Sequence, residues 1–274
     1  GSLTADRAFK ANDLVLGSKS GAVGNMILQA DAEVGGAKVN KGSTLDLGQN
    51  TLKISGGQFQ GNDFASFMDG STLAFYYDGS KGGQIAGNVN LEGKVNLKPT
   101  IALGTADGTH NFITDGNISY IDKTVSNTET YGKEIDADKV GWVLAQDNNL
   151  YNLAVGEDNK SLIVEQKAGD EIAASTGANS NQANAVQAVL AGGKAPAENT
   201  AFNNVASTAT ALLQSDNPEE VAAGLKVVDQ LSVDTSSFAQ STMVAHNTQI
   251  ANVVGTRLSG GLSAAQQGMS SGDT

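Results

Sequence analysis

The sequence contains no cysteine, which excludes three kinds of chemistry at once. Without thiols the chain forms no disulfide framework, no redox pair and no zinc site with thiolate ligands. Long apolar runs are also missing, because no window approaches the roughly 18 consecutive apolar residues that a membrane-spanning helix requires. We therefore expect no segment that crosses a membrane as a helix.

Positive charge is scarce as well. The 274 residues include 17 Lys and Arg against 29 Asp and Glu, which gives a formal net charge of -12. A surface that binds nucleic acid needs clustered Lys and Arg, so we expect no nucleic-acid partner. Glycine is plentiful at 33 residues, whereas only 5% of the chain is aromatic and 17% is charged. Many small residues with little charge favour a repetitive, stacked structure over a compact enzyme.

Short alternating apolar runs, broken by Gly, Asn and Asp, extend over residues 12–166. Such a pattern is typical of strands separated by turns. In GSTLDLGQNTLKISGG, residues 42–57, Leu45 and Leu47 alternate with polar residues, and a second alternating run follows the corner. Similar alternating runs recur at residues 70–80 and 84–97. Their spacing predicts coils of roughly 20 to 30 residues, which is the range of solenoid repeats.

This alternation predicts a mainly β chain that forms a parallel β-helix, with apolar side chains inside each coil and stacked on those of its neighbours. An up-and-down sandwich would show the same alternation and is the alternative. Asn residues recur at the expected corners, where we predict left-handed backbone and side-chain amides stacked between coils. These residues are Asn50, Asn88, Asn90 and Asn96.

Residues 116–168 are expected to cap the end of this stack, because an open last coil would expose unpaired strand edges. The segment holds the only tryptophan, Trp142, which we expect to anchor the core. Around a turn at residues 156–159, a β-hairpin should place one apolar set against another that includes Ile163. The candidate cap residues are Trp142, Leu150, Leu153, Val155, Leu162 and Val164.

Beyond the cap, apolar residues recur at helical spacing and predict helices over 179–191, 199–214 and 217–231. Asn217 offers an N-cap side chain, and Glu220 is placed to reach back to the cap amide. The expected division of the chain is a β-helix stem (1–115), a capping module (116–168), a weakly packed helical linker (169–216) and a helical pair (217–274).

PEEVAAGLKVVDQLS, followed by a polar helix that ends in IANVVGTRLSG, resembles the junction between passenger and barrel in single-chain (type V) autotransporters of Gram-negative bacteria. The resemblance implies a right-handed parallel β-helix. It also implies that Thr235–Leu258 threads the pore of an outer-membrane β-barrel outside this chain. The candidate pore residues are Phe238, Ile250, Asn252, Val253, Arg257 and Leu258. A helical pair that packs as an ordinary C-terminal subdomain is the alternative.

The same resemblance implies a fragment of a secreted passenger, located at the cell surface, in the outer membrane or released. The β-helix would be a rigid stem, and the cap an autochaperone-like module for folding and translocation, in support of adhesion or virulence. Its partners would be its own barrel, periplasmic chaperones, the barrel-assembly machinery and, in adhesion, a host-cell receptor or a second copy of itself. Some members cleave themselves between two Asn residues, but here Asn252 precedes Val253, so self-cleavage is not expected.

Residues suited to catalysis are few. The two histidines, His110 and His246, have no second histidine at metal-ligand spacing, and no GxSxG, P-loop or GxGxxG motif is present. The acidic residues Glu134, Asp136 and Asp138 do not follow the order of an EF-hand loop. We therefore expect no enzyme, no cofactor and no metal. His110, in the turn-like DGTHN, is expected to be exposed.

A direct adhesin is the first rival interpretation. Tyr76 and Tyr77 belong to the one concentration of aromatic residues, and an outward ring could stack on a host glycan or contact a host protein. The simpler alternative is that alternate residues of this run fill the coil. A second rival, a polysaccharide-acting β-helix enzyme, would need several carboxylates on one face, and the sequence shows no such cluster.

Overall fold

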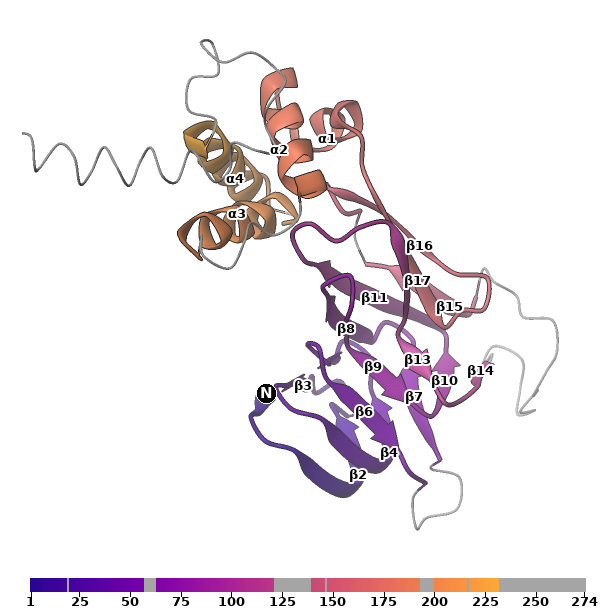
Figure 1. Ribbon diagram of the computed structural model, residues 1–274. Helices are drawn as coiled ribbons and strands as arrows, with labels where there is room; N and C mark the ends of the chain where they lie inside the picture. The colour runs from indigo at the N-terminus through magenta and orange to yellow at the C-terminus, as the bar shows by residue number, and fades with distance from the viewer. Residues whose placement is uncertain are drawn as a thin grey trace, which may run out of the picture. The chain divides into compact units, whose positions relative to one another are not determined.

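The computed structural model describes residues 1–18, 20–56, 63–120, 139–145, 147–192, 200–215 and 217–231. The chain divides into two compact units, residues 1–167 and residues 168–274. The first unit contains the strands and the second contains the helices (Figure 1). Each unit is described by itself below.

One side of the first unit is a six-stranded sheet in which every neighbouring pair is parallel. In spatial order its strands are β1 (Ser2–Ala5), β3 (Asn25–Leu28), β5 (Thr44–Asp46), β8 (Thr72–Tyr77), β11 (Lys94–Ile101) and β15 (Gly141–Leu144). Partner residues show the length of a coil, since Asn25 pairs with Thr44, 19 positions later, and Thr44 pairs with Thr72, 28 positions later. The predicted solenoid period is thus confirmed.

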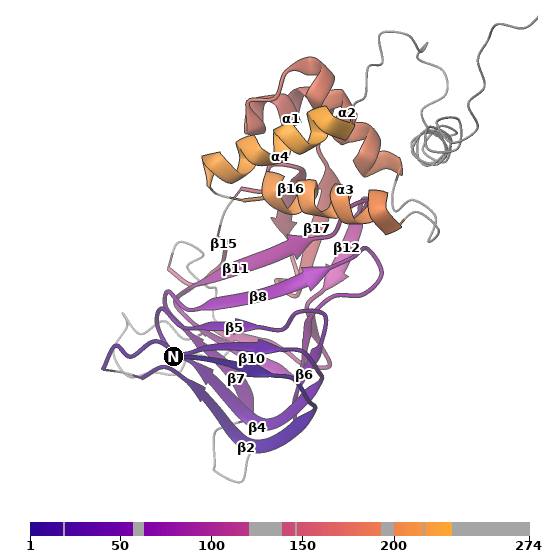
Figure 2. The same ribbon diagram turned by 90° about the vertical axis from the view of Figure 1, so that its left-hand side faces the viewer.

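A second parallel sheet makes the remaining two sides of each coil. Its strands are β2 (Phe9–Leu16), β4 (Ala32–Val39), β6 (Thr51–Ile54), β7 (Phe64–Met68), β9 (Gln84–Ala86), β10 (Asn88–Glu92), β13 (Ile113–Thr114) and β14 (Ile118–Tyr120). The first half of β4 pairs with β6 and its second half with β7, so the strand bends around a corner. The unit is therefore the predicted parallel β-helix and not a sandwich, with β2 in its first coil (Figure 2).

The core of the solenoid consists of columns of identical or similar side chains, one from each coil. Leu45, Leu73 and Leu97 occupy aligned positions in three successive coils, and all three are fully buried. Burying a leucine side chain contributes about 1.5 to 3 kcal/mol relative to leaving it exposed. Because the leucines aligned in a column belong to successive coils, the columns make stability depend on stacking.

Asparagine side chains do connect neighbouring coils, but not with the backbone that we predicted. The Asn50 Nδ2 atom donates to the Leu28 carbonyl of the preceding coil at 2.8 Å, and the Asn88 Oδ1 atom accepts from the Asn117 amide of the following coil at 2.9 Å. The left-handed corner lies instead at Gly48, whose φ is 53°. The prediction of left-handed Asn50, Asn88, Asn90 and Asn96 was wrong. Asn90 and Asn96 lie inside strands, and near Asn50 and Asn88 the positive φ falls on Gly48 and Gly87, which carry no Cβ penalty.

The end of the solenoid carries a small antiparallel sheet formed by β12 (Gly108–Asn111), β17 (Ser161–Gln166) and β16 (Tyr151–Val155). The predicted hairpin is confirmed, with Leu153 opposite Val164 and Val155 opposite Leu162. Ile163 does not belong to the facing set. It pairs with Ala154 on the other face and is 37% exposed.

The second unit contains α1 (Gly169–Thr176), α2 (Ser180–Gly192), α3 (Thr200–Leu213) and α4 (Pro218–Leu231). The helices predicted at α2, α3 and α4 are confirmed, whereas α1 was not predicted. Helix α3 packs on α4, α1 packs on α2, and α2 contacts α4. None of the described helices combines the length and apolar character needed to cross a membrane.

These helices form a compact unit and not the weakly packed linker that we expected. Ile172, Leu213 and Val228 are at most 5% exposed, and the Gln182 side chain of α2 donates to the Asp229 carboxylate of α4 at 2.9 Å. At the start of α4, the Asn217 Oδ1 atom accepts from the Glu219 amide at 3.0 Å, as an N-cap should. The predicted capping box, in which Glu220 would accept directly from the Asn217 amide, is not formed. The Asn217 amide donates to the Ser215 hydroxyl, and that hydroxyl is hydrogen-bonded to the Glu220 carboxylate.

The buried columns predict that alanine substitutions at inward positions of the six-stranded sheet cost much more stability than those at outward positions. Leu73→Ala should lower the free energy of unfolding by about 2 to 5 kcal/mol, because it opens a cavity inside the stack. Ile27→Ala is the matched control on the outer face of β3, where the side chain is 42% exposed, and should cost less than about 1 kcal/mol. Urea denaturation monitored by circular dichroism measures both. Equal losses would contradict the assignment of inner and outer faces.

Candidate functional site: the C-terminal cap of the solenoid

Six aromatic rings form a continuous chain from the last coils of the solenoid into the antiparallel sheet. Centroid distances between successive rings run from 4.6 to 5.8 Å, which is the range of favourable aromatic pairs. In order of contact the rings are Phe67, Trp142, Phe112, Phe75, His110 and Tyr77. The chain joins β7 and β8 to β12 and β15, so the last coils are held together by packing across several elements.

Trp142 connects the last parallel strand to the hairpin. Its ring meets Phe67 at 5.8 Å and Phe112 at 5.4 Å, both edge-on, and its Nε1 atom donates to the Asn159 carbonyl in the hairpin turn at 2.9 Å. The side chain is partly buried, with both its apolar face and its polar edge engaged. These contacts are those of an anchor between β15 and the cap.

The turn that receives Trp142 is shaped by Asp158 and Asn159. The Asp158 Oδ1 atom accepts from the Lys160 amide at 2.9 Å, the Ser161 amide at 3.1 Å and the Ser161 hydroxyl at 2.7 Å. Burial opposes ionisation of Asp158, but these hydrogen bonds outweigh it and lower its pKa. Asn159 takes a left-handed φ of 55°, which Asn tolerates better than most residues.

Tyr151 ties the hairpin to the loop that follows β11. Its ring is 1% exposed, and its hydroxyl donates to the Ala102 carbonyl at 2.8 Å. Burial raises the pKa of Tyr151 to about 12, so the hydroxyl keeps its proton and remains a donor. A second tie is made by Gln166, whose side chain donates to the Thr105 carbonyl at 2.8 Å and whose amide donates to Asp107 at 2.7 Å.

His110 lies in β12, which pairs with β17, and only 8% of the residue is exposed. The expectation of an exposed turn residue was wrong. The His110 Nε2 atom lies 2.9 Å from the Gly83 carbonyl, and because a carbonyl only accepts, this nitrogen carries the proton. Glycine is required beside the ring, since a Cβ at Gly82 would lie 2.6 Å from it. Burial lowers the pKa of His110, and the hydrogen bond to Gly83 offsets only part of that effect.

The sequence-predicted cap residues come together at this site. Leu150, Leu162 and Val164 are fully buried, and Leu153, Val155 and Trp142 are partly buried. Sequence reasoning missed Phe112, Tyr151 and His110. The alternation of His110 and Phe112 in THNF is the signal that could have identified them as inward-facing residues of a short strand.

The aromatic pair proposed for ligand contact is split between two environments. Tyr77 is 5% exposed, stacks on His110 at 4.6 Å and donates to the Gly79 carbonyl at 3.1 Å. It therefore offers no exposed ring for a ligand. Tyr76 is partly exposed on the opposite side of β8. Alternate residues of this aromatic run thus fill the coil.

Several predicted residues lie outside the described part of the chain. They are Phe238, Ile250, Asn252, Val253, Arg257 and Leu258 of the pore helix, the histidine His246, and the acidic residues Glu134, Asp136 and Asp138.

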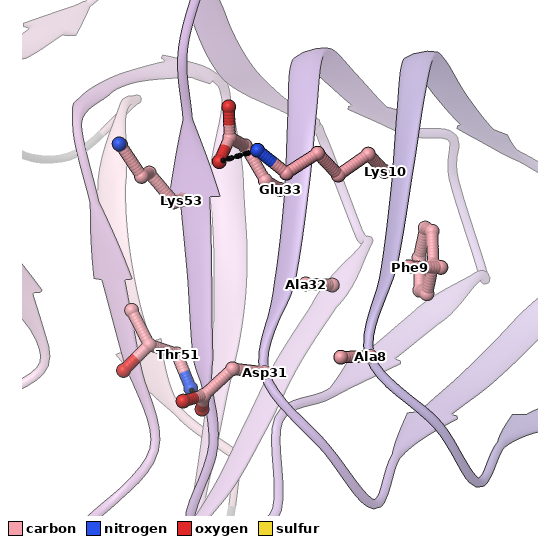
Figure 3. Close-up of a pocket in the computed structure, with 8 residues that line it drawn as sticks. All are labelled: Ala8, Phe9, Lys10, Asp31, Ala32, Glu33, Thr51 and Lys53. Atoms are coloured by element: carbon pink, nitrogen blue, oxygen red, sulfur yellow. Dashed lines mark hydrogen bonds and ion pairs between the residues drawn. The ribbon is translucent and has the colours of Figure 1, made fainter.

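A shallow hollow of about 520 Å³ lies far from the cap, on the outer face of β2, β4 and β6 (Figure 3). Lys10, Glu33 and Lys53 occupy aligned outward positions there, and the Lys10 Nζ atom lies 3.0 Å from Glu33 Oε2. Asp31 accepts from the Thr51 amide at 2.7 Å. Both carboxylates of the hollow are thus already engaged in links between coils.

None of the family models, curated proteins and solved structures compared with the chain matches it. The assignment of a role therefore depends on the geometry of the cap and on the sequence itself.

The hydrogen bond from the Tyr151 hydroxyl to the Ala102 carbonyl should contribute measurably to the free energy of unfolding. Tyr151→Phe removes the hydroxyl, but the Ala102 carbonyl still accepts from the Thr105 hydroxyl at 2.9 Å, so we expect the loss of one net hydrogen bond, about 0.5 to 1.5 kcal/mol in the free energy of unfolding. Tyr76→Phe is the matched control at a partly exposed position and should change it by less than about 0.5 kcal/mol. Thermal and urea denaturation of both variants check this. A neutral Tyr151→Phe would show that the tie does not stabilise the cap.

Buried His110 should make stability depend on pH. Its folded-state pKa is lowered below the unfolded value near 6.5, so its contribution is present above that value and is lost as pH falls through the lowered pKa. We expect the free energy of unfolding to decrease below about pH 6.5 and this decrease to be smaller in His110→Gln. His246→Gln, which removes the other histidine, should retain the full decrease. Urea titrations between pH 7.5 and about 4.5 decide which histidine is responsible.

Proposed function

We propose that the chain is part of an exported autotransporter passenger, in which residues 1–167 form a rigid stem and its folding cap at the surface of a Gram-negative bacterium. The observation that carries the proposal is the antiparallel sheet β12–β17–β16, which ends the parallel solenoid and is followed by a separate helical unit. The resemblance of PEEVAAGLKVVDQLS to the passenger–barrel junction supports the same assignment. Under it, the partners are an outer-membrane barrel, periplasmic chaperones and the barrel-assembly machinery.

The cap is suited to start folding because its hairpin, β16–β17, pairs residues that are close in sequence. Strands β16 and β17 join through a short turn, whereas each parallel strand must find a partner 19 or more positions away. Closing a short loop costs less conformational entropy and hairpins form in about 1 to 10 μs, so a local hairpin forms before distant parallel pairs. Trp142 and Tyr151 then link this hairpin to the last coils.

Autotransporter passengers support adhesion or virulence, and we propose that the stem of this chain contributes as a rigid spacer. A direct adhesin that uses the aromatic pair is not proposed, because Tyr77 is buried. We likewise propose a structural and not a catalytic role, since Trp142, Tyr151 and Gln166 bond to other parts of the cap and stem.

Surface display tests this proposal. Residues 1–274 would be placed between a signal peptide and the barrel of a known autotransporter, and protease accessibility on intact cells would report export. The cap variant is Trp142→Ala, and the matched control is Leu73→Ala, a single large-to-small substitution of similar expected cost in the middle of the stem. We expect several-fold less display from the cap variant than from the control, because the cap acts during folding and not only in the final fold.

Two outcomes would contradict the proposal. Absence of the wild-type chain from the cell surface would remove the assignment as an exported passenger. Equal display of the cap variant and Leu73→Ala would retain export but remove the special folding role of the cap.

A further inference from the structure

His110 belongs to the antiparallel sheet, but its ring makes its contacts with the stem. The ring stacks on Tyr77 with centroids 4.6 Å apart and 19° between the planes, and it lies 5.3 Å from Phe75. Both of these rings belong to β8, and the Gly83 carbonyl, which accepts from the His110 Nε2 atom at 2.9 Å, follows that strand. This one side chain therefore joins the cap sheet to a coil of the stem.

The backbone loop that receives the imidazole is held in place. The Asp78 Oδ1 atom accepts from the Lys81 amide at 2.7 Å, and the Gly83 amide donates to the Tyr76 carbonyl at 3.1 Å. A Cβ at Gly82 would lie 2.6 Å from the imidazole, so the ring fits closely against this loop. Because the loop is fixed by its own hydrogen bonds, water reaches the buried ring when the cap sheet moves away from the stem.

A charged imidazole would lack an opposite charge at this position. From β8, the titratable group that faces it is Tyr77, whose hydroxyl donates to the Gly79 carbonyl. From β17, its paired residue is the apolar Leu162. In the loop, the Asp78 carboxylate is engaged by backbone amides and by the Gln49 side chain at 2.9 Å. The nearest carboxylate is thus already used to fix the loop.

The other charged residues of these elements are engaged elsewhere or exposed. Asp107, just before β12, accepts from the Gln166 amide at 2.7 Å, and the Lys160 ammonium donates to a backbone carbonyl between β13 and β14 at 2.7 Å. Lys81 and Glu165 are exposed. Among the described residues, no charged group contributes to the pKa of the imidazole, which burial lowers and the hydrogen bond to the loop only partly restores.

Protonation would change the balance of these contacts. The Nε2 atom already carries a proton in the hydrogen-bonded tautomer, so a second proton adds to Nδ1 and gives the ring a full charge. Aromatic faces attract a cation, which favours the charged ring, but removal from water opposes charge in a buried site. Burial is the larger effect here, because the pKa of His110 is lowered. The ring therefore takes up a proton more readily once it is hydrated.

Separation of the cap sheet from the stem can be local. Among the described strands, β12, β16 and β17 pair only with one another. When they move away, β8 and β11 keep each other as partners, and so do the coils before them. In stacked repeats each unit contacts only its neighbours, so one end can open while the remainder stays folded. Tyr151 loses its bond to Ala102 in this opening, which keeps the open state rare at neutral pH.

We propose that His110 is a proton-sensitive latch on the cap: in mildly acidic conditions its protonated ring leaves the stem, and the β12–β17–β16 sheet separates while the parallel coils stay folded. The sign follows from linkage. Because the pKa of His110 is lowered in the closed state, its contribution to closure is present above the unfolded value of 6.5 and is lost as pH falls through the lowered pKa. The latch does not depend on export, since it concerns contacts within residues 1–167.

Hydrogen exchange of the full 274-residue chain, followed by mass spectrometry at about pH 7.5 and about pH 5, tests the latch. After correction for the intrinsic pH dependence of exchange, the amides of β12, β16 and β17 should lose at least about fivefold and at most about 30-fold of their protection. The upper bound is the effect of an exposed histidine with a pKa of about 6.5. In acid, this exchange should depend on urea less steeply than that of β5 and β8, because a local opening exposes less surface than global unfolding.

His110→Gln is the main variant, because a glutamine amide can still donate to the Gly83 carbonyl but takes up no proton in this range. It should abolish the acid-dependent loss of protection in the cap. His246→Gln removes the other histidine and should retain the full loss. Every carboxylate is the same in the two variants, so their comparison separates the imidazole from acidic residues that titrate nearby.

The ring signals of the two histidines, followed by NMR, provide a measurement that requires no change at His110. His246→Gln identifies the His110 signals, which should titrate below about pH 6.5. Titration at or above that value would overturn the proposal.

Three results of the exchange experiment would also overturn it. They are unchanged or increased protection of the cap in acid, an acid effect that persists in His110→Gln, and a urea dependence equal to that of β5 and β8. The last would mean that the stem unfolds as a whole. Each of them leaves export and the folding role of the cap untouched, because surface display measures those separately.

Discussion

Stacking of one coil on the next is the constraint on which this structure depends. A single coil cannot bury its own apolar side chains, because Leu45, Leu73 and Leu97 reach each other only across coil boundaries. Backbone hydrogen bonds obey the same rule, since the partner of each parallel strand lies one coil away. An interior coil has neighbours on both sides and a terminal coil on one. The two ends of the stack therefore decide how much of this favourable burial the chain retains.

At the C-terminal end of the stack, parallel strand pairing gives way to antiparallel pairing. The antiparallel β12–β17–β16 sheet does not present the next parallel register, and the chain of rings from Phe67 to Tyr77 fills the interior of the last coils. Polar groups at this junction are matched, with Trp142 bonded to Asn159 and Tyr151 to Ala102. Matched polar groups fix the position of the hairpin, whereas apolar packing alone would permit sliding.

The sequence alone predicted the coil length, the parallel solenoid and the hairpin, because each depends on local alternation of apolar residues and on turn residues. It was not sufficient for the direction in which certain side chains point. Alternation shows that Tyr76 and Tyr77 lie on opposite faces, but the inner face depends on the coil that stacks on them. His110 was misassigned for the same reason, since β17 covers it from more than 50 positions away. Helix α1 was missed because its one fully buried residue, Ile172, gives no periodic pattern over eight residues.

The difference between the two ends gives the stem a direction. Local opening requires the loss of fewer contacts at an end with one neighbour than at an end tied by rings and hydrogen bonds, so the first coil should open more readily than the cap. Under the proposed function, folding would start at the cap and add coils from there toward β2 and β1, because each parallel strand needs a neighbouring coil with which to pair.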